Sequence, residues 1–597
     1  MQFRRALIAI TLGSALLPAT FFAATARPKD ARKTPESANP VVRRWMRSMS
    51  LRDKIAQLVV VPIYGEPMNA RSAAFRKYQH EVRNLRVGGV IVTSRVQNGL
   101  VRNAEPYAMA AMLNRLQKMS KLPLLVAADF ERGASMRVAS ATPWPYSMAF
   151  AAGRDLADAT YQGAETAREA RAMGVNWLFA PVADVNNNPD NPIINIRSFG
   201  EDPKEVSAFV GAFITGAHSD KANPVLVTVK HFPGHGDTAS DSHIGLARLE
   251  APLERIESVE LAPFRAAIAN GVDAVMTAHL SVPALDPVDQ PATVSSKIVS
   301  GVLRTELNFH GIIVTDAMDM QGLTSLFNTA EASVRAIEAG TDVLLRPGRA
   351  EEAISGVLAA VESGRIKHQR IDESVAKVLQ AKVELGLSRK RIVNLEGIAE
   401  TVDTPEAEER AQQVSDRALT LVKDDKDSVP LRNPDRICLI VLTENRRGQQ
   451  GLKLIEEVKK RAPGMTTILV DPLTSKADLA DISAKTAGFT QVIVAAYVTV
   501  SAYRGNVALA GNYPDFLNSL IAGKIPVTLV ALGNPYLVRS FPSVATYLTT
   551  YSPTTTSEIS VAKALFGEIP IGGRLPVTIP DIAKYGQGIQ LPAIHTQ

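Results

Sequence analysis

The 597-residue chain contains a single cysteine, Cys438. One thiol forms no internal disulfide, and thiolate zinc sites and iron–sulfur clusters are excluded because they need several cysteines. Cys438 lies in the apolar run RICLIVL, so we interpret it as a buried core thiol. The chain also lacks a strong excess of one charge, since 66 basic residues face 60 acidic ones. The chain therefore lacks the large excess of basic residues that is typical of nucleic-acid-binding proteins, and no nucleic-acid partner is expected.

Two further features are missing. No glycine-rich fingerprint that cradles phosphate is present, and we expect no cofactor. Beyond residue 26, no segment approaches the roughly 20 uninterrupted apolar residues that a membrane span needs. We therefore expect no stable membrane insertion of the mature protein.

The first 26 residues are typical of a cleavable signal peptide. Arg4 and Arg5 precede an apolar run over 6–24, and the run ends in the small residues Ala-Thr-Ala at 24–26. An uncleaved membrane anchor is the alternative, but Pro18 and the Ala-x-Ala site argue against it. The mature protein is then expected to be periplasmic or secreted, with residues 27–40 as a flexible lead-in.

Short β-branched runs alternate with longer amphipathic stretches between residues 41 and 387. The runs are 59–64, 89–93, 124–129, 177–185, 225–232, 274–280, 311–316 and 342–347, and the helical patterns include 72–84, 155–173, 204–218 and 253–269. Eight apolar strands that alternate with helices predict an α/β fold, an N-terminal (β/α)8 TIM barrel. A doubly wound open sheet is the alternative, although it rarely has eight such units.

A second set of apolar runs follows a charged linker over 388–404. The runs are 419–422, 437–442, 467–470, 492–496, 527–532 and 544–548. Helical segments separate several of them. Residues 405–597 are therefore predicted to form a smaller α/β/α layered C-terminal domain.

The densest polar segment, KHFPGHGDTASDSH, covers 230–243 and leaves the fifth predicted strand. The active site of a TIM-barrel enzyme lies at the C-terminal ends of the barrel strands, and this segment begins at one of those ends. Asp241 and His243 are two residues apart, so the carboxylate can hold one ring nitrogen while the other faces substrate. That pairing predicts a general acid/base. A metal site made from the histidines at 231, 235 and 243 with Asp241 is one alternative, and a structural loop is the other.

Asp316 ends the apolar run in GIIVTDAMDM. A carboxylate at the end of a buried strand is costly unless it is hydrogen-bonded or used in chemistry. Its position at the top of the barrel suits a nucleophile, and a helix-capping role is the alternative. We expect Asp319 to cap the helical turn that follows.

A third set of residues is typical of sugar recognition. Asp129 ends the third strand in DFERG, Arg137 follows eight positions later, and Arg197 opens RSFGEDP. Carboxylate and guanidinium groups around one cavity hold sugar hydroxyls through charge-assisted hydrogen bonds. Each residue alone could instead belong to a surface ion pair.

These motifs resemble glycoside hydrolase family 3, in the two-domain form of its β-N-acetylglucosaminidase branch. The resemblance covers nearly the whole mature chain, from MSLRDKIAQL at 49–58 to LFGE and GRLPV near the end. It implies that Asp316 is the nucleophile and His243 the acid/base, with Asp241 as its partner. It further implies that sugar binding falls to Asp129, Arg137, Arg197, Lys230 and His231, and it implies no metal.

One segment departs from the family pattern. The common Asp-x-Glu-Gly-Gly reads DFERG here, with Arg132 in place of a glycine. The resemblance implies a retaining double displacement. Together with the export that the signal-peptide pattern predicts, it makes peptidoglycan fragments or related glycans the expected substrates. In many members of this family the second domain supplies a catalytic carboxylate. Here the loop histidine His243 makes that carboxylate unnecessary. We therefore expect the second domain to buttress the barrel or to shape the far side of the cleft.

Four other functions remain open from the residues alone. A phosphorylase would use phosphate where the hydrolase uses water, and a β-glucosidase or β-xylosidase would share the scaffold. A metal-dependent hydrolase would use the histidine cluster. A non-catalytic sugar-binding module is opposed by the intact candidates for nucleophile and acid/base.

Overall fold

The computed structural model describes residues 39–66, 68–97, 100–445 and 448–594. The predicted signal peptide lies outside the described residues, as does most of the predicted lead-in. Within the described ranges, no helix combines the length and apolar character that a membrane crossing requires.

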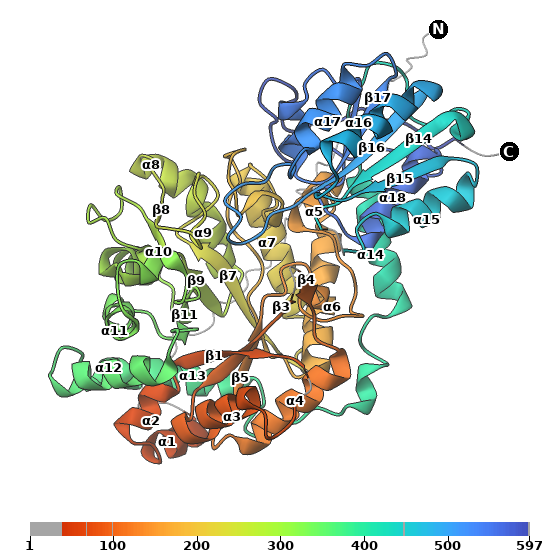
Figure 1. Ribbon diagram of the computed structural model, residues 1–597. Helices are drawn as coiled ribbons and strands as arrows, with labels where there is room; N and C mark the ends of the chain where they lie inside the picture. Colours follow the sequence, from red (N-terminus) through yellow and green to blue (C-terminus); the bar gives the residue numbers. More distant parts are fainter. Residues whose placement is uncertain (1–38, 67, 98–99, 446–447, 595–597) are drawn as a thin grey trace, which may run out of the picture.

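The N-terminal part forms a nearly closed parallel barrel, which confirms the predicted (β/α)8 fold (Figure 1). Its strands, within the described residues, are β1 (Val59–Tyr64), β2 (Gly89–Thr93), β5 (Leu125–Ala128), β6 (Trp177–Leu178), β7 (Leu226–Phe232), β9 (Ala274–Thr277), β11 (Ile312–Thr315) and β12 (Leu344–Leu345). The sheet runs in the order β11-β9-β7-β6-β5-β2-β1-β12. A parallel bridge between Val314 and Val343 links its two end strands.

The fourth predicted strand is much shorter than expected. The run 177–185 keeps only Trp177–Leu178 as β6, and Val182 then forms an isolated bridge to Lys230. Pro181 interrupts the ladder because proline has no N–H to donate. The chain beyond Pro181 still follows β7, since the Ala183 N–H donates to the Lys230 carbonyl at 2.7 Å.

Helices surround the barrel. They are α1 (Pro40–Arg47), α2 (Leu51–Ala56), α3 (Ala73–Gln79), α4 (Pro106–Met119), α5 (Ser147–Gly153), α6 (Leu156–Ala172), α7 (Pro203–Ala217), α8 (Leu253–Arg255), α9 (Ala262–Ala269), α10 (Gln321–Thr324), α11 (Thr329–Ala339), α12 (Ala350–Glu362) and α13 (His368–Glu384). The amphipathic stretch over 253–269 is helical, as predicted, but it is not one continuous α-helix. It is divided into α8, a π-helical turn over Ile256–Glu260 and α9, with Pro263 in the first turn of α9. Proline is tolerated there because first-turn N–H groups have no partner inside the helix.

Shorter elements complete the N-terminal part. A small antiparallel hairpin consists of β3 (Arg95–Gln97) and β4 (Leu100–Arg102), and β8 (Ala247–Arg248) pairs with β10 (Leu280–Ser281). Other π-helical turns cover His80–Leu85 and Lys297–Glu306, and short 3-10 turns cover Ala134–Met136, Asn195–Arg197, Ala292–Val294 and Glu396–Ile398.

The C-terminal part is a separate mixed sheet between helices, as predicted. In the part of the chain that the structure describes, its strands are β13 (Thr420–Asp424), β14 (Ile437–Leu442), β15 (Thr466–Val470), β16 (Gln491–Val498), β17 (Val527–Gly533) and β18 (Thr546–Thr549). The order is β13-β18-β17-β16-β14-β15, and β13 alone pairs antiparallel among these strands. The free Cys438 on β14 is buried, as expected.

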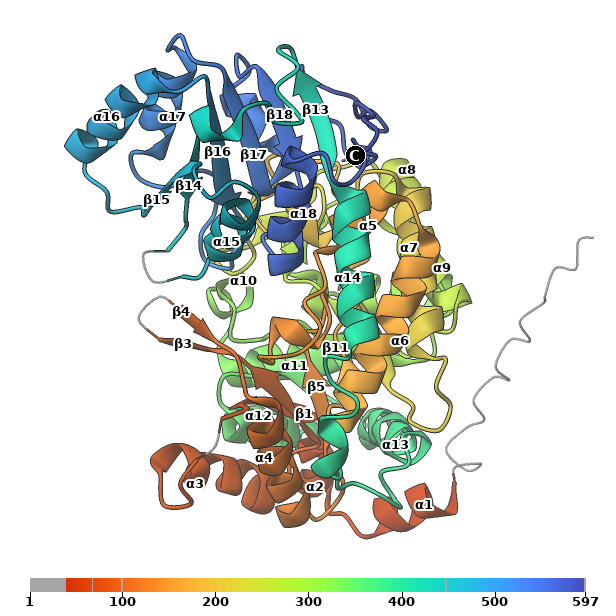
Figure 2. The ribbon, with the colours of Figure 1, turned by 90° about the vertical axis from the view of Figure 1, so that its right-hand side faces the viewer.

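Helices cover both faces of this sheet. One face packs against α16 (Lys476–Lys485) and α17 (Tyr513–Ile521), and the other packs against α15 (Leu452–Arg461) and α18 (Thr555–Leu565). Helix α14 (Pro405–Ala418) joins the two domains and runs beside α6 (Figure 2). Shorter 3-10 turns cover Pro434–Arg436, Thr486–Gly488 and Pro535–Ser540.

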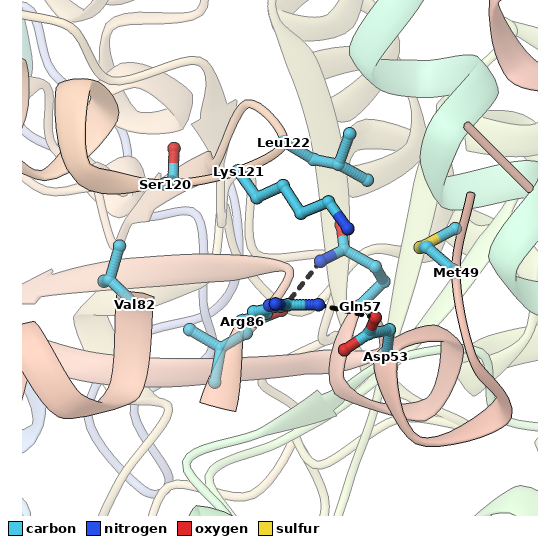
Figure 3. A pocket seen from close by; sticks show the side chains of 9 residues that line it. Met49, Asp53, Gln57, Val82, Arg86, Ser120, Lys121 and Leu122 are labelled. Atoms are coloured by element: carbon cyan, nitrogen blue, oxygen red, sulfur yellow. Dashed lines mark hydrogen bonds and ion pairs between the residues drawn. The ribbon is translucent and has the colours of Figure 1, made fainter. Parts of the chain in front are cut away.

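Packing and local polar contacts leave little space beside Asp53 and Arg86, at the N-terminal end of the barrel (Figure 3). Arg86 donates to Asp53 at 2.8 Å, and the Gln57 side chain donates to the Arg86 carbonyl at 2.7 Å. The cavity beside them has a volume of about 10 Å³, which is room for about one water molecule. This cavity is therefore too small for a substrate.

Candidate active site

A cleft of about 570 Å³ opens at the opposite end of the barrel. Residues that follow the C-terminal ends of the strands line it together with the second-domain segment 500–503. Its polar lining includes Asp129, Glu131, Arg132, Arg137, Arg197, Lys230, His231, His243, Asp316, Asp319 and Arg346. Each predicted site residue lines this cleft except Asp241, which lies behind His243.

Asp316 directly follows β11. Its backbone N–H donates to the Thr277 carbonyl at 3.0 Å, and its Oδ1 accepts from the Ala317 N–H at 2.7 Å. Burial alone would raise the pKa of Asp316, but the nearby imidazoles of His231, His279 and His243 lower it. An ionised carboxylate at this place can attack an electrophilic carbon.

The expected cap at Asp319 is wrong. Met320 occupies the position before α10 and forms no side-chain cap. Asp319 instead pairs with Arg346, which follows β12, at 2.7 Å. The nearby guanidinium offers a charge-assisted partner that is stronger than a neutral backbone N–H.

Asp241 and His243 form the predicted pair. Oδ1 of Asp241 lies 2.7 Å from Nδ1 of His243 and also accepts the His243 backbone N–H at 2.9 Å. The Asp241 side chain is fully buried, whereas that of His243 is 24% exposed. Burial would raise the pKa of Asp241, but hydrogen bonds from His243 lower it. The carboxylate fixes a proton on Nδ1 and leaves Nε2 for proton exchange.

Glycine lets this loop lie close to the barrel. A Cβ on Gly236 would come within 1.8 Å of the Val185 carbonyl oxygen, so only glycine fits there. His235 anchors the same loop, since its two ring nitrogens lie 2.7 Å from Thr238 Oγ1 and 3.0 Å from Ser242 Oγ. Burial lowers the pKa of His235 to about 4, so its ring is neutral near pH 7.

The second domain contacts this pair directly. The Tyr503 backbone N–H donates to Oδ2 of Asp241 at 3.0 Å, and the Tyr503 ring lies 5.1 Å from the His243 ring, measured between centroids. Sequence reasoning missed Tyr503, because 262 residues separate it from Asp241 and no motif marks it. Residues 500–503 of the second domain line the cleft, which agrees with the expectation that this domain shapes the far side of the cleft.

A cluster of alternating charges forms the floor of the cleft. Lys230 Nζ lies 2.8 Å from Asp129 and 2.7 Å from Glu131. Arg137 donates to Asp129 at 2.9 Å, and Arg197 donates to both carboxylate oxygens of Glu131, at 2.9 and 2.8 Å. Sequence reasoning missed the role of Glu131, although it lies in the same motif as Asp129.

This cluster keeps its members charged despite burial. Burial would raise the pKa of Asp129, but Lys230 and Arg137 hold it well below its usual value. Burial likewise opposes the charge on Lys230, but Asp129 and Glu131 raise its pKa. Charged groups held in place by ion pairs are preorganised donors and acceptors for sugar hydroxyls.

His231 is oriented by a buried carboxylate. Its Nδ1 lies 2.7 Å from Oδ2 of Asp184, and Oδ1 of Asp184 accepts the backbone N–H groups of His231 and His235 at 3.2 and 2.7 Å. The histidines at 231, 235 and 243 thus each have a different partner. Among the described residues, no group of three histidine, cysteine or carboxylate side chains is arranged to hold a metal ion.

Arg132 lies in the same cleft, at the position where the sequence departs from the family pattern. Its guanidinium lies 5.5 Å from the centre of the Tyr146 ring. Tyr146 itself packs against the hydrophobic core of the second domain. Arg132 therefore occupies the side of the cleft that faces the domain boundary.

The N-terminal and C-terminal domain models of one protein family match the two parts of this chain. The model of the glycosyl hydrolase family 3 N-terminal domain matches residues 50–381, and that of the C-terminal domain matches residues 394–594. A β-N-acetylglucosaminidase/β-glucosidase from Cellulomonas fimi is 29% identical over 521 residues, which are 83% of this chain and 89% of that protein.

Two solved structures share the fold along most of their length. A family 3 β-N-acetylglucosaminidase from Paenibacillus sp. str. FPU-7 is 31% identical with a TM-score of 0.78, over 89% of this chain and 99% of that one. A β-glucoside phosphorylase is 26% identical with a TM-score of 0.79, over 90% of this chain and 96% of that one.

Proposed function

Because the chain belongs to glycosyl hydrolase family 3, we propose that it is a retaining exo-β-N-acetylglucosaminidase that removes terminal β-linked N-acetylglucosamine. One observation carries the proposal. Asp316 and His243, which Asp241 holds from behind, line a single cleft beside a charged cluster suited to sugar hydroxyls. The names of the relatives from Cellulomonas and Paenibacillus support the choice of sugar.

The first step forms a covalent intermediate. Asp316 attacks the anomeric carbon, and an ester bond forms between them as the glycosidic C–O bond breaks. Protonated His243 gives its Nε2 proton to the departing oxygen, while Asp241 holds Nδ1. The sugar is now inverted on Asp316, and His243 is neutral.

The second step releases the sugar. Neutral His243 accepts a proton from water, and the water oxygen attacks the anomeric carbon. The ester bond to Asp316 breaks, and its carboxylate is restored. Two inversions give net retention of the β-configuration. The separation of two carboxyl groups does not predict the outcome here, because the acid/base is an imidazole.

Sugar binding in this proposal falls to Asp129, Arg137, Arg197, Lys230 and His231. Their ion pairs are formed before substrate arrives, so little reorganisation is needed on binding. We further propose that the enzyme acts outside the cytoplasm, on peptidoglycan fragments or related glycans. The signal-peptide pattern of residues 1–26 supports export.

A phosphorylase on the same scaffold is the second candidate, because one structural neighbour is a β-glucoside phosphorylase. Phosphate would replace water in the second step and yield a sugar 1-phosphate. Product analysis with and without millimolar phosphate separates the two reactions. Rates on aryl β-N-acetylglucosaminide, β-glucoside and β-xyloside separate the glycosidase specificities.

Covalent trapping tests the assignment of the nucleophile. A fluorosugar that forms a slowly hydrolysed ester should label the peptide containing Asp316, as read by mass spectrometry. Asp316→Ala should lower kcat/KM for an aryl β-N-acetylglucosaminide by about 10⁴-fold or more. Asp319→Ala removes a neighbouring carboxylate and serves as the control, with a much smaller loss. A label on any other residue, or near-native turnover by Asp316→Ala, contradicts the proposal.

A further inference from the structure

A loop of the second domain completes the hydrogen bonding of the acid/base pair. The loop follows β16, and its Tyr503 N–H donates to Oδ2 of Asp241 at 3.0 Å. The other carboxylate oxygen, Oδ1, is occupied by the ring and backbone nitrogens of His243. One oxygen of Asp241 is thus held within its own segment, and the other is held from the second domain.

The loop is itself firmly anchored in the second domain. Glu444, which follows β14, accepts hydrogen bonds from the Thr499 N–H at 3.0 Å and from the Thr499 hydroxyl at 2.6 Å. It also pairs with Arg504 at 2.6 Å, on the C-terminal side of Tyr503. The Glu444 carboxylate, which is 10% exposed, therefore holds both ends of the short stretch that carries Tyr503.

Packing reinforces the hydrogen bond. Tyr503 has a φ of +67°, a left-handed conformation that residues other than glycine adopt only when their surroundings hold them. The Tyr503 ring meets the His243 ring at 66°, an edge-on arrangement. Two residues further on, a Cβ on Gly505 would lie 3.2 Å from Cδ1 of Ile244, so the two loops are in close contact.

We propose that Tyr503 is a positioning residue for proton transfer, through which the second domain sets the orientation of the Asp241–His243 pair. Its N–H fixes the rotation of the Asp241 carboxylate, and its ring limits the rotation of the His243 imidazole. The inference rests on the proposed function, and it assigns to the second domain a role in the protonation step in addition to shaping the cleft.

The proposal predicts a selective defect. A dinitrophenolate departs without protonation, whereas an unactivated phenolate needs the proton of His243. A misplaced acid should therefore slow cleavage of an unactivated aryl β-N-acetylglucosaminide and leave cleavage of the dinitrophenyl substrate nearly unchanged. A general structural disturbance would lower both rates together.

Two variants of the full chain separate the contributions. Tyr503→Gly keeps the N–H and accepts the positive φ, but removes the ring. Glu444→Ala releases the anchor of the loop and so weakens the N–H contact as well. Leu473→Gly, at a residue of the second domain that is 73% exposed, is the matched control. Thermal melting of each variant shows that the fold is retained.

We expect Glu444→Ala to lower kcat/KM for the unactivated substrate about tenfold or more, within the roughly 10²–10⁴-fold range of general acid catalysis. Tyr503→Gly should give a smaller selective loss, and both variants should stay within about threefold on the dinitrophenyl substrate. Equal losses on both substrates, or no loss in either variant, overturn the proposal. If the unaltered enzyme cleaves neither substrate, the proposed function itself fails, so the two failures are distinguishable.

Discussion

The two halves of the candidate site are built differently. The charged floor, with Lys230 between Asp129 and Glu131, comes from the barrel alone, and the Lys230 and Glu131 side chains are 3% and 2% exposed. The acid/base pair lies on a loop, and its His243 side chain is 24% exposed and contacts the second domain. Under the proposed function, sugar binding is thus preorganised within the barrel, whereas proton transfer depends on both domains.

His243→Ala is the strongest test of the loop half. Loss of the acid/base should lower kcat/KM on an unactivated aryl β-N-acetylglucosaminide by about 10²–10⁴-fold, because no group then protonates the leaving oxygen. Values of kcat/KM for that substrate and for its dinitrophenyl analogue measure the effect. The loss should be smaller for the analogue, because its leaving group departs without protonation. His310→Ala, at an exposed histidine, is the control. Near-native rates in His243→Ala would show that the loop half of the site does not carry the proton transfer.

Lys230→Met tests the barrel half. It leaves the buried Glu131 and the partly buried Asp129 without their shared cation, and breaking a buried pair costs roughly 3–5 kcal/mol. Urea unfolding should show this loss in the transition of the barrel. Lys423→Met removes a more exposed pair with Asp425 and should change little. If the two variants unfold alike, the charged floor is not a structural unit.

The N-terminal end of the barrel, opposite the active-site cleft, offers a pH-dependent contrast. Lys382 is fully buried, its Nζ donates to Gln57 Oε1 at 2.7 Å, and burial lowers its pKa to about 7. Unfolded lysine has a pKa near 10.4, so between about pH 7 and 10 the unfolded state binds an extra proton. This residue therefore makes stability rise with pH in that window, and the contribution is lost as pH falls toward 7.

Lys382→Met should remove that dependence. The slope of unfolding free energy against pH should fall by up to about 1.4 kcal/mol per pH unit between pH 7.5 and 9.5. Urea titrations at three pH values measure the slope. Lys390→Met, at an exposed lysine, supplies the comparison. Parallel curves for the variant and the unaltered protein would contradict the assignment.

Arg86→Ala should have the smallest effect. Arg86 pairs with Asp53 at the N-terminal end of the barrel, where the Arg86 side chain is 39% exposed, so the pair is screened by solvent. Its loss should cost less than about 1 kcal/mol and leave kcat/KM unchanged. Thermal melting and aryl glycosidase rates check both statements. A catalytic defect here would show that the two ends of the barrel are coupled.

Much of the fold could be predicted because its signals are local. Each buried strand is an apolar run in the sequence. The runs before Pro181 and around Cys438, for example, form the buried strands β6 and β14 in the structure. The errors are also local in origin. Pro181 ended a strand early, and a long helix was divided near Pro263. Asp319 was assigned as a cap because its ion-pair partner, Arg346, is distant in sequence.

The sequence by itself determined the alternation of strands and helices, the carboxylate at the end of β11 and the two-residue spacing that joins Asp241 to His243. Each is a relation between neighbours along the chain, so it leaves a readable pattern. Only the tertiary structure decided that Lys230 bridges two carboxylates and that Tyr503 reaches Asp241 across 262 positions. Such contacts arise from the closure of the barrel and the docking of the second domain, and neither has a periodic signature in the sequence.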